Sequence, residues 1–361
     1  MSERRVVITG IGAVTPLGAS LDATLTALAD GQAAPRPATL FDASGFACPL
    51  AAEVRDWDPR PWFRVPKALK LTDRPSRFAV AAAHMALTEA GWPMDDEAAG
   101  ERLGIVIGSS GSDLQARDIG RALAGDAAGA SIASVPDFAD RVLRGLNPLW
   151  LLVSLPNMTS AHVAIQVQAR GPNSTIMSDW AAGHQAIGEA AEWIRSGEAD
   201  AVLAGGADSG IQPFAYAAYE QAGLFDAHEP AFVPGEGAAM FLLEERGAAL
   251  TRGRQPFAEL VGYASATGDA DRAVAETTCE ALRRAAWTRE TVAAHGRGRF
   301  DPRLGHPLAA AAPIDLARLI VTAGQGARLL STAIGCSGEA VTLAVETSSH
   351  IVARRPAPLA H

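Results

Sequence analysis

Hydrophobic runs alternate along this chain with stretches that have helical periodicity. The β-branched run Arg5–Gly12 predicts a buried strand, and the glycines at its end predict a tight turn. A helix is expected near Leu21–Ala29. Apolar residues at helical spacing predict another over Pro75–Ala90, before a second buried strand over Leu103–Gly108. Strands that alternate with helices in this way indicate an α/β protein with parallel or mixed sheets and helices on their faces.

One segment carries most of the information about chemistry. Over residues 174–188 a strand is expected to pass through a sharp turn into a helix, and residues 197–208 follow as a helix stop and a further buried strand. Such a turn presents a side chain at a helix N-terminus, whose free N–H groups stabilise a thiolate or oxyanion. Its apex holds Asp179 and Trp180, and neither carries an acyl group well. The segment predicts a scaffold for covalent chemistry without the covalent residue, or else an ordinary packed turn.

Two histidines are further candidates for chemistry. His295 and His306 each stand beside a glycine, between apolar segments. Together they could bind a thioester carbonyl and stabilise the enolate that decarboxylation forms. The alternative is that both are ordinary loop residues.

Composition excludes several classes of protein. The three cysteines show no CxxC spacing, which argues against a disulfide framework and a zinc site and for a reducing compartment, expected to be the cytoplasm. We expect neither a metal nor a cofactor. The net charge of −9 without a basic block makes nucleic acid a poor candidate partner. The chain has no apolar run long enough for a membrane span, and its opening residues lack a signal-peptide pattern.

The length of 361 residues exceeds one ordinary core, so two domains or two fused halves are expected. A weak internal echo favours two halves. The pattern VVITGIGAVTP recurs loosely over residues 260–267, and ADAVLAGGAD recurs within ARLLSTAIGCSGEAVTLAVE near the C-terminus. We therefore predict an N-terminal half over residues 1–245 and a shortened C-terminal half over residues 246–361.

Taken in order, several segments resemble the β-ketoacyl–acyl carrier protein synthases of the thiolase superfamily. RRVVITGIGAVTPLG looks like the opening strand of that family, residues 156–208 resemble its dimer-interface and active-cysteine region, and FVPGEGAAMFLLE resembles its GEGA strand. His295-Gly296 and Gly305-His306 are similar to its two catalytic histidine motifs, and residues 334–338 to its terminal glycine-rich loop. The resemblance covers most of the chain. It implies a five-layered αβαβα thiolase fold built from two similar halves, the second shortened.

The departures from the family pattern fall on the positions that carry its chemistry. Trp180 stands where the family has its cysteine, and Asp301 where it has a lysine five residues before the second histidine. A helix and a strand that the family places between the two histidine motifs are missing. The terminal loop has lost its two phenylalanines, to Ile334 and Cys336. We therefore expect no catalytic residue here, with Trp180 as a plug and with His295 and His306 outside enolate-stabilising geometry.

Degenerate members of this family include the chain-length factors of type II polyketide systems, which lack the cysteine and pair with an active synthase as a heterodimer. The resemblance implies a non-catalytic subunit that shapes the acyl tunnel of such a ketosynthase, with the acyl carrier protein docking mainly on the partner. Trp180 and the shortened second half look more like the factors of reducing polyene pathways, such as aryl polyenes. Two other classes stay open: a stand-alone malonyl-thioester decarboxylase or acyl hydrolase that uses His295 and His306, and a homodimeric scaffold that binds a carrier protein.

Synthases of this family pair through the strand and helix before the elbow, which here means about Asn147 to Ser178. The stretch NPLWLLVSLPNM is rich in large apolar residues, and obligate interfaces are core-like in composition. We place the interface and the end of the tunnel at Leu149, Leu151, Val153, Leu155, Asn157 and Met158. A larger side chain there would end the tunnel sooner, because an overpacked apolar pocket is destabilised. The alternative is that residues 149–155 belong to the internal core.

Overall fold

The computed structural model describes residues 4–111, 134–146, 148–225, 232–297 and 301–349. The strands within these ranges are β1 (Val6–Val14), β2 (Arg36–Pro37), β3 (Leu50–Ala51), β4 (Leu103–Ser109), β5 (Asn173–Met177), β6 (Ala201–Ser209), β7 (Glu236–Glu245), β8 (Ala258–Thr267), β9 (Ala294–Arg297), β10 (Arg328–Ile334) and β11 (Glu339–Thr347). The α-helices are α1 (Leu21–Ala29), α2 (Arg74–Glu89), α3 (Glu97–Glu101), α5 (Val135–Gly145), α6 (Leu151–Ser154), α7 (Met158–Val167), α8 (Ala182–Ser196), α9 (Pro213–Gln221), α10 (Arg246–Thr251), α11 (Ala270–Ala285) and α12 (Ala311–Thr322). Short 3₁₀ turns connect several of these elements, including η4 (Pro302–Leu304) and η5 (Leu308–Ala310).

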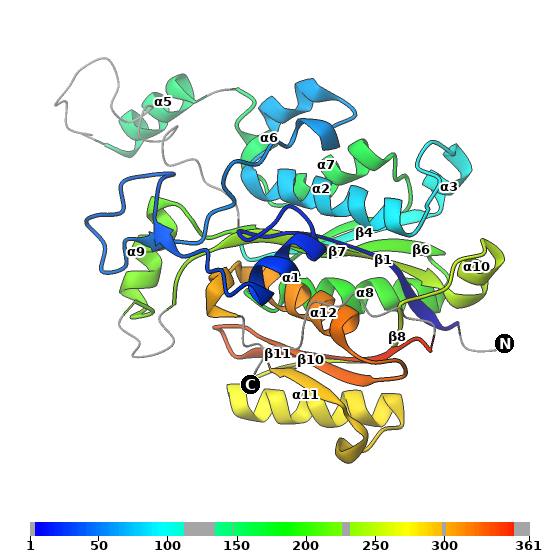
Figure 1. Cartoon of the computed structure of the whole chain (residues 1–361). Helices are drawn as coiled ribbons and strands as arrows, with labels where there is room; N and C mark the ends of the chain where they lie inside the picture. Colours follow the sequence, from blue (N-terminus) through cyan, green and yellow to red (C-terminus); the bar gives the residue numbers. More distant parts are fainter. Residues whose placement is uncertain (1–3, 112–133, 147, 226–231, 298–300, 350–361) are drawn as a thin grey trace.

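Nine of the strands form one sheet in the order β5-β4-β6-β7-β1-β8-β11-β10-β9. Among the described residues, two residue pairs join its two parts, Val7 with Glu259 and Ile8 with Ala258. Beyond that junction the parts separate into two layers, with α1, α8 and α12 between them (Figure 1). Helices α2 and α7 cover the outer face of the first layer, and α11 covers the outer face of the second (Figure 1). The predicted αβαβα arrangement is confirmed.

The second part of the sheet repeats the strand order of the first. β4 and β6 are parallel, as are β9 and β10, and each pair continues into two antiparallel steps: β6 to β7 to β1, and β10 to β11 to β8. β5, which pairs with the outer side of β4, has no counterpart beside β9 among the described residues. This correspondence supports the proposed division into residues 1–245 and a shorter half over residues 246–361.

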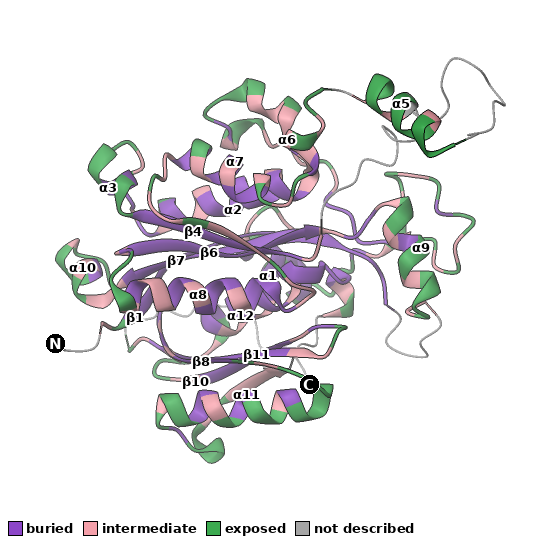
Figure 2. Ribbon diagram, turned by 180° about the vertical axis from the view of Figure 1, so that it is seen from behind, coloured by how far each residue is buried: buried purple, intermediate pink, exposed green. Residues whose placement is uncertain are grey.

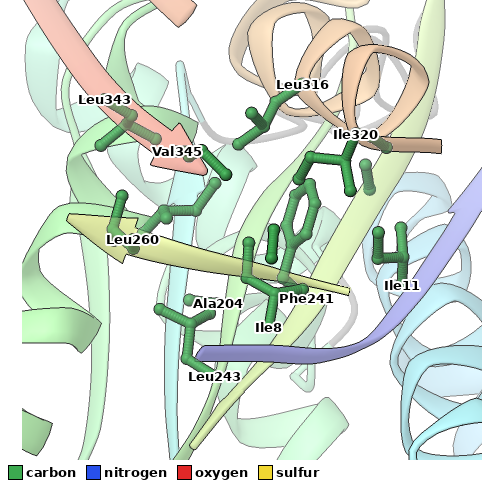
Figure 3. Close-up of a cluster of buried hydrophobic side chains, with 14 of the residues drawn as sticks. Ile8, Ile11, Ala204, Phe241, Leu243, Leu260, Leu316, Ile320, Leu343 and Val345 are labelled. Atoms are coloured by element: carbon green, nitrogen blue, oxygen red, sulfur yellow. The ribbon is translucent and has the colours of Figure 1, made fainter. Parts of the chain in front are cut away.

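The main core lies between the two sheet layers. Ile8 and Phe241 from the first layer meet Leu343 from the second, and Leu316 and Ile320 of α12 fill the space between them (Figure 3). Burial of apolar side chains contributes roughly 25 cal/mol per Å² of surface removed from water. Because strand pairing between the layers involves two residue pairs in the described part of the chain, this shared core is the main connection between them.

The glycines of the first strand do not form the turn that the sequence analysis predicted. β1 continues to Val14, and the turn follows at Thr15–Gly18. A Cβ atom at Gly10 would lie 2.0 Å from the carbonyl oxygen of Ala86, and one at Gly12 would lie 2.0 Å from that of Ala82. The prediction was wrong because these glycines allow the backbone of α2 to approach the strand, which is the other common use of glycine.

Candidate functional site

The turn between β5 and α8 is tied to the loop between β10 and β11. The carboxylate of Asp179 accepts a hydrogen bond from the backbone N–H of Trp180 at 2.7 Å. Its other oxygen accepts from the N–H of Ser337 at 2.9 Å and from its hydroxyl at 3.2 Å. The hydroxyl of Ser178 donates to Glu339. The elbow and the terminal glycine-rich loop therefore form one hydrogen-bonded unit.

Trp180 fills the space in front of this elbow. Its ring stacks on Phe232, with centroids 5.7 Å apart and an interplanar angle of 16°. The ring of His306 lies 4.4 Å from Trp180 and 5.3 Å from Phe232. The three rings pack against one another at the elbow.

His306 is buried behind Trp180, and it is neutral. Burial lowers its pKa to about 4, although the nearby carboxylate of Asp179 acts in the opposite direction. Its Nδ1 atom accepts the backbone N–H of Leu308 at 3.1 Å, so the neutral ring carries its proton on Nε2. The side chain could donate a hydrogen bond, but at neutral pH it carries no charge.

His295 lies on the side of the second sheet layer that faces α11, and not on the side of His306. Its Nε2 atom is 2.9 Å from the hydroxyl of Thr332, which continues through Thr342 to Thr277 on α11. The side chain next to Thr332 along β10, Ser331, points the opposite way, toward α8. The second sheet layer therefore separates His295 from His306, and the structure does not bring the two histidines together.

Asp301, at the position of the family lysine, is engaged in local structure. Its carboxylate caps η4 by accepting the N–H of Arg303 at 3.0 Å, and it forms an ion pair of 2.6 Å with the same residue. Arg303 also donates to the carbonyl of Leu28 in α1. Through Arg303, the carboxylate thus braces this turn against α1.

A cavity of about 220 Å³ adjoins Trp180 at the carboxyl ends of the parallel strands β4 and β6. Its lining includes Asp179, Trp180, Asp208, Gln212 and Tyr219. Ligands of open α/β sheets commonly bind at this edge. Asp208 was not among the site residues predicted from the sequence, although an acidic residue directly after the buried run AVLAGGA is a signal for it.

Asp208 is the buried carboxylate of this cavity. It accepts the N–H of Ser110 at 2.7 Å and its hydroxyl at 2.6 Å, and it also accepts the N–H groups of Ser209 and Ala309. Burial nevertheless raises the pKa of Asp208 to about 6, and the four hydrogen bonds only partly offset that effect. The carboxylate therefore exchanges its proton close to neutral pH.

This raised pKa has a measurable effect on stability. Between the unfolded pKa, about 3.9, and the folded pKa, the folded protein binds more protons at Asp208 than the unfolded chain does, so its contribution to stability falls as pH rises. As pH rises from 4.5 to 6.5, we expect the unaltered protein to lose about 2 kcal/mol of unfolding free energy through Asp208. The Asp208→Asn variant should not show this loss. Urea unfolding of both proteins across this range measures it. Parallel pH profiles for the two proteins would contradict the assignment.

The predicted interface segment lies on the surface. Leu149, Leu151 and Leu155 are 49%, 43% and 42% exposed. Asn157 is also exposed, and Val153 and Met158 are half-buried. Residue 147 lies outside the described residues. The alternative that residues 149–155 form internal core does not agree with these exposures.

Neighbouring elements carry two further exposed apolar side chains. Ile165 on α7 and Met177 at the end of β5 are both more than half exposed, and β5 is an edge strand of the sheet. Figure 2 shows α6 and α7 with exposed and half-buried residues on the outer side of the first layer. Exposed large apolar side chains that gather in one region mark interaction surfaces.

The described ranges show neither a metal-binding cluster nor a membrane-spanning helix. They contain no group of three or more His, Cys, Asp and Glu side chains that could hold a metal ion. In the same ranges, no helix has both the length and the apolar character that crossing a bilayer requires.

The five layers and the elbow between β5 and α8 define a protein of the thiolase fold, and solved structures of that fold match it over nearly its whole length. The ishigamide ketosynthase/chain length factor matches with a TM-score of 0.78 and 24% identity, over 96% of this chain and 100% of that one. A β-ketoacyl synthase from Burkholderia phymatum matches with a TM-score of 0.80 and 24% identity, over 95% and 99%. A type II PKS acyl-carrier protein in complex with its ketosynthase bound to the hexaketide matches with a TM-score of 0.71 and 22% identity, over 96% and 100%.

The family itself is established by sequence. Residues 3–249 match the family model described as the N-terminal domain of beta-ketoacyl synthase. The chain therefore belongs to the β-ketoacyl synthase family. Curated relatives include the 3-oxoacyl-[acyl-carrier-protein] synthases 2 of Synechocystis, 33% identical over 73% of this chain, and of Coxiella burnetii, 32% identical over 75%. The matches span only 63% and 64% of the length of these relatives.

Proposed function

We propose that this chain is a non-catalytic chain-length-factor subunit that pairs with an active β-ketoacyl–acyl carrier protein synthase and shapes its acyl tunnel. The observation that carries the proposal is the plug at the elbow. Trp180 occupies the position of the nucleophile and packs between Phe232 and His306. A site closed by Trp180 holds no nucleophilic cysteine. The condensation that the family performs would therefore take place on the partner.

The other positions of family chemistry support the same conclusion. Asp301 is paired with Arg303, and His295 faces α11, away from His306. A stand-alone decarboxylase or acyl hydrolase that uses both histidines would need them on one side of the sheet. That alternative therefore has no support in the geometry.

The exposed apolar segment from Leu149 to Leu155 supports a partner. An obligate interface buries roughly 2,000 Å² or more and resembles a core in composition. The solved structures that match this chain include a ketosynthase/chain length factor and a complex of a ketosynthase with its acyl-carrier protein. We propose that the partner is an active ketosynthase, that the carrier protein docks mainly on it, that the product is a polyketide or polyene chain, and that the complex is cytoplasmic.

Co-expression with an active ketosynthase of the same organism tests the proposal. The expected result is a stable heterodimer that condenses malonyl units on an acyl carrier protein, while this chain alone shows no condensation. Condensation by the purified chain alone, or failure to form a complex, would sink the proposal. Mass measurement without the ketosynthase tests the homodimeric scaffold, which requires a stable dimer of this chain that binds carrier protein.

A further inference from the structure

The one-turn helix α6 carries two of the proposed tunnel residues, Leu151 and Val153, and a third, Leu155, caps its C-terminus. The backbone hydrogen bonds of so short a helix stabilise it only weakly. It spans only Leu151–Ser154, and no side chain caps its N-terminus at Trp150. A helix this short is marginal without tertiary support, because nucleation costs more than one turn of hydrogen bonds returns. Something outside α6 must therefore fix its position.

A proline after α6 removes the helical donor that the carbonyl of Leu152 would otherwise have. The carbonyl of Leu152 would accept the N–H of residue 156 in a continued helix, but residue 156 is proline and has no N–H. Proline also forces the preceding residue out of the helical region, and Leu155 has φ −75° and ψ 130°. The helix ends at this point, and the carbonyl of Leu152 needs a partner from another element.

His162 on α7 supplies that partner. Its Nε2 atom lies 3.3 Å from the carbonyl oxygen of Leu152, and the side chain is only 4% exposed. Its Nδ1 atom is buried without a hydrogen-bond partner among the described residues. A carbonyl only accepts, so Nε2 carries the proton and donates to Leu152.

The helix that carries His162 is firmly anchored. Thr159 of α7 shares a hydrogen bond of 3.0 Å with Ser76 of α2, and both side chains are buried. On the other side, Ser160 accepts a hydrogen bond from Thr175 of β5 at 2.9 Å. His162 thus connects α6 to a helix that is itself bonded to α2 and to the sheet.

We propose that His162 is the positioning residue that fixes α6, and through α6 the place where the partner's acyl tunnel ends. The inference rests on the proposed function, since it assigns to His162 the setting of chain length in that complex. His162 touches neither substrate nor the elbow. It acts by holding Leu151, Val153 and Leu155 in a fixed position relative to the partner's tunnel.

Two measurements on the heterodimer test this role. In His162→Phe, which keeps the volume of the ring but lacks the donor, amides of residues 152–155 are expected to exchange with solvent about tenfold faster, while those of α2 do not change. If α6 is no longer held in place, the tunnel can lengthen. The ratio of products longer than those of the unaltered complex to products of the same length is therefore expected to rise at least about threefold. His162→Gln, whose amide N–H restores a donor, should return both values toward wild type.

His84→Phe is the control, because it replaces a half-buried histidine on the neighbouring helix α2 and leaves α6 unaltered. It should alter neither the exchange of residues 152–155 nor the products. If His162→Phe does not fold, His162→Asn replaces it, with an amide too short to reach Leu152 and with the same expected results. Unchanged exchange or unchanged products in an intact heterodimer would overturn the role of His162. Absence of a heterodimer with the unaltered chain would instead overturn the proposed function, and the exchange of residues 152–155 would still decide whether His162 holds α6.

Discussion

Replacement of Trp180 by cysteine is expected to yield a protein with no condensation activity above background. The new thiol would lie at the N-terminus of α8 and beside His306, as a family nucleophile would. A second donor to the thioester oxygen would still be missing, because His295 faces α11, and removal of one such donor costs about 10²–10³-fold in rate. The lysine position is held by Asp301, and the terminal loop remains bound to Asp179. These losses add to one another, so one restored side chain does not restore catalysis.

The measurement is mass spectrometry of acyl and malonyl carrier proteins incubated with the purified variant. Trp180→Ala is the matched control, since it opens a similar void without a thiol. We expect both variants to lose about 1–2 kcal/mol of unfolding free energy, because Trp180 is only half-buried and a fully buried tryptophan costs more. Labelling with iodoacetamide checks that the thiol is accessible. Condensation by Trp180→Cys well above Trp180→Ala would show that the catalytic machinery is more intact than proposed.

Aspartates in place of Leu151 and Leu155 are expected to break the proposed heterodimer. Both leucines are more than two-fifths exposed in the isolated chain, so the substitution leaves the fold stable. In the complex the two carboxylates would be buried without partners, and centrally placed interface residues can each contribute 2 kcal/mol or more. We therefore expect the dissociation constant to rise by roughly 10²–10³-fold, which corresponds to about 3–4 kcal/mol.

Titration calorimetry of the two subunits measures this change. Leu250→Asp provides the control, because Leu250 is a similarly exposed leucine on α10, at the opposite end of the first layer from α6 (Figure 1). Its affinity should match that of the unaltered chain. A double aspartate variant that binds as tightly as wild type would place the interface elsewhere.

Local patterns in the sequence were enough to predict most of the elements. The helices around Leu25 and Phe78 and the strands around Ile107 and Leu203 stand where periodicity and β-branched runs placed them. The layering was predicted only from the resemblance to a family, because hydrophobic patterning does not determine which layer packs on which.

The details of the site depended on side-chain direction, which a sequence does not show. His295 and His306 looked equivalent, yet one points from an edge strand toward α11 and the other lies behind Trp180. Asp208 acquires its raised pKa from burial at a strand end that is assembled by distant segments. The glycines of β1 looked like turn residues because their partner, α2, lies more than sixty residues further along the chain.

The central place of β1 in the sheet also has a consequence for biosynthesis. β1 pairs along its length with β7, which is made much later, so that Val6 lies opposite Glu245. It cannot find that neighbour until some 240 residues have been made, and pairings this distant in sequence fold slowly. Until then its apolar side chains have no sheet to enter. We expect the nascent chain to depend on chaperones through most of its synthesis, and co-translational supply of the partner subunit to raise its yield.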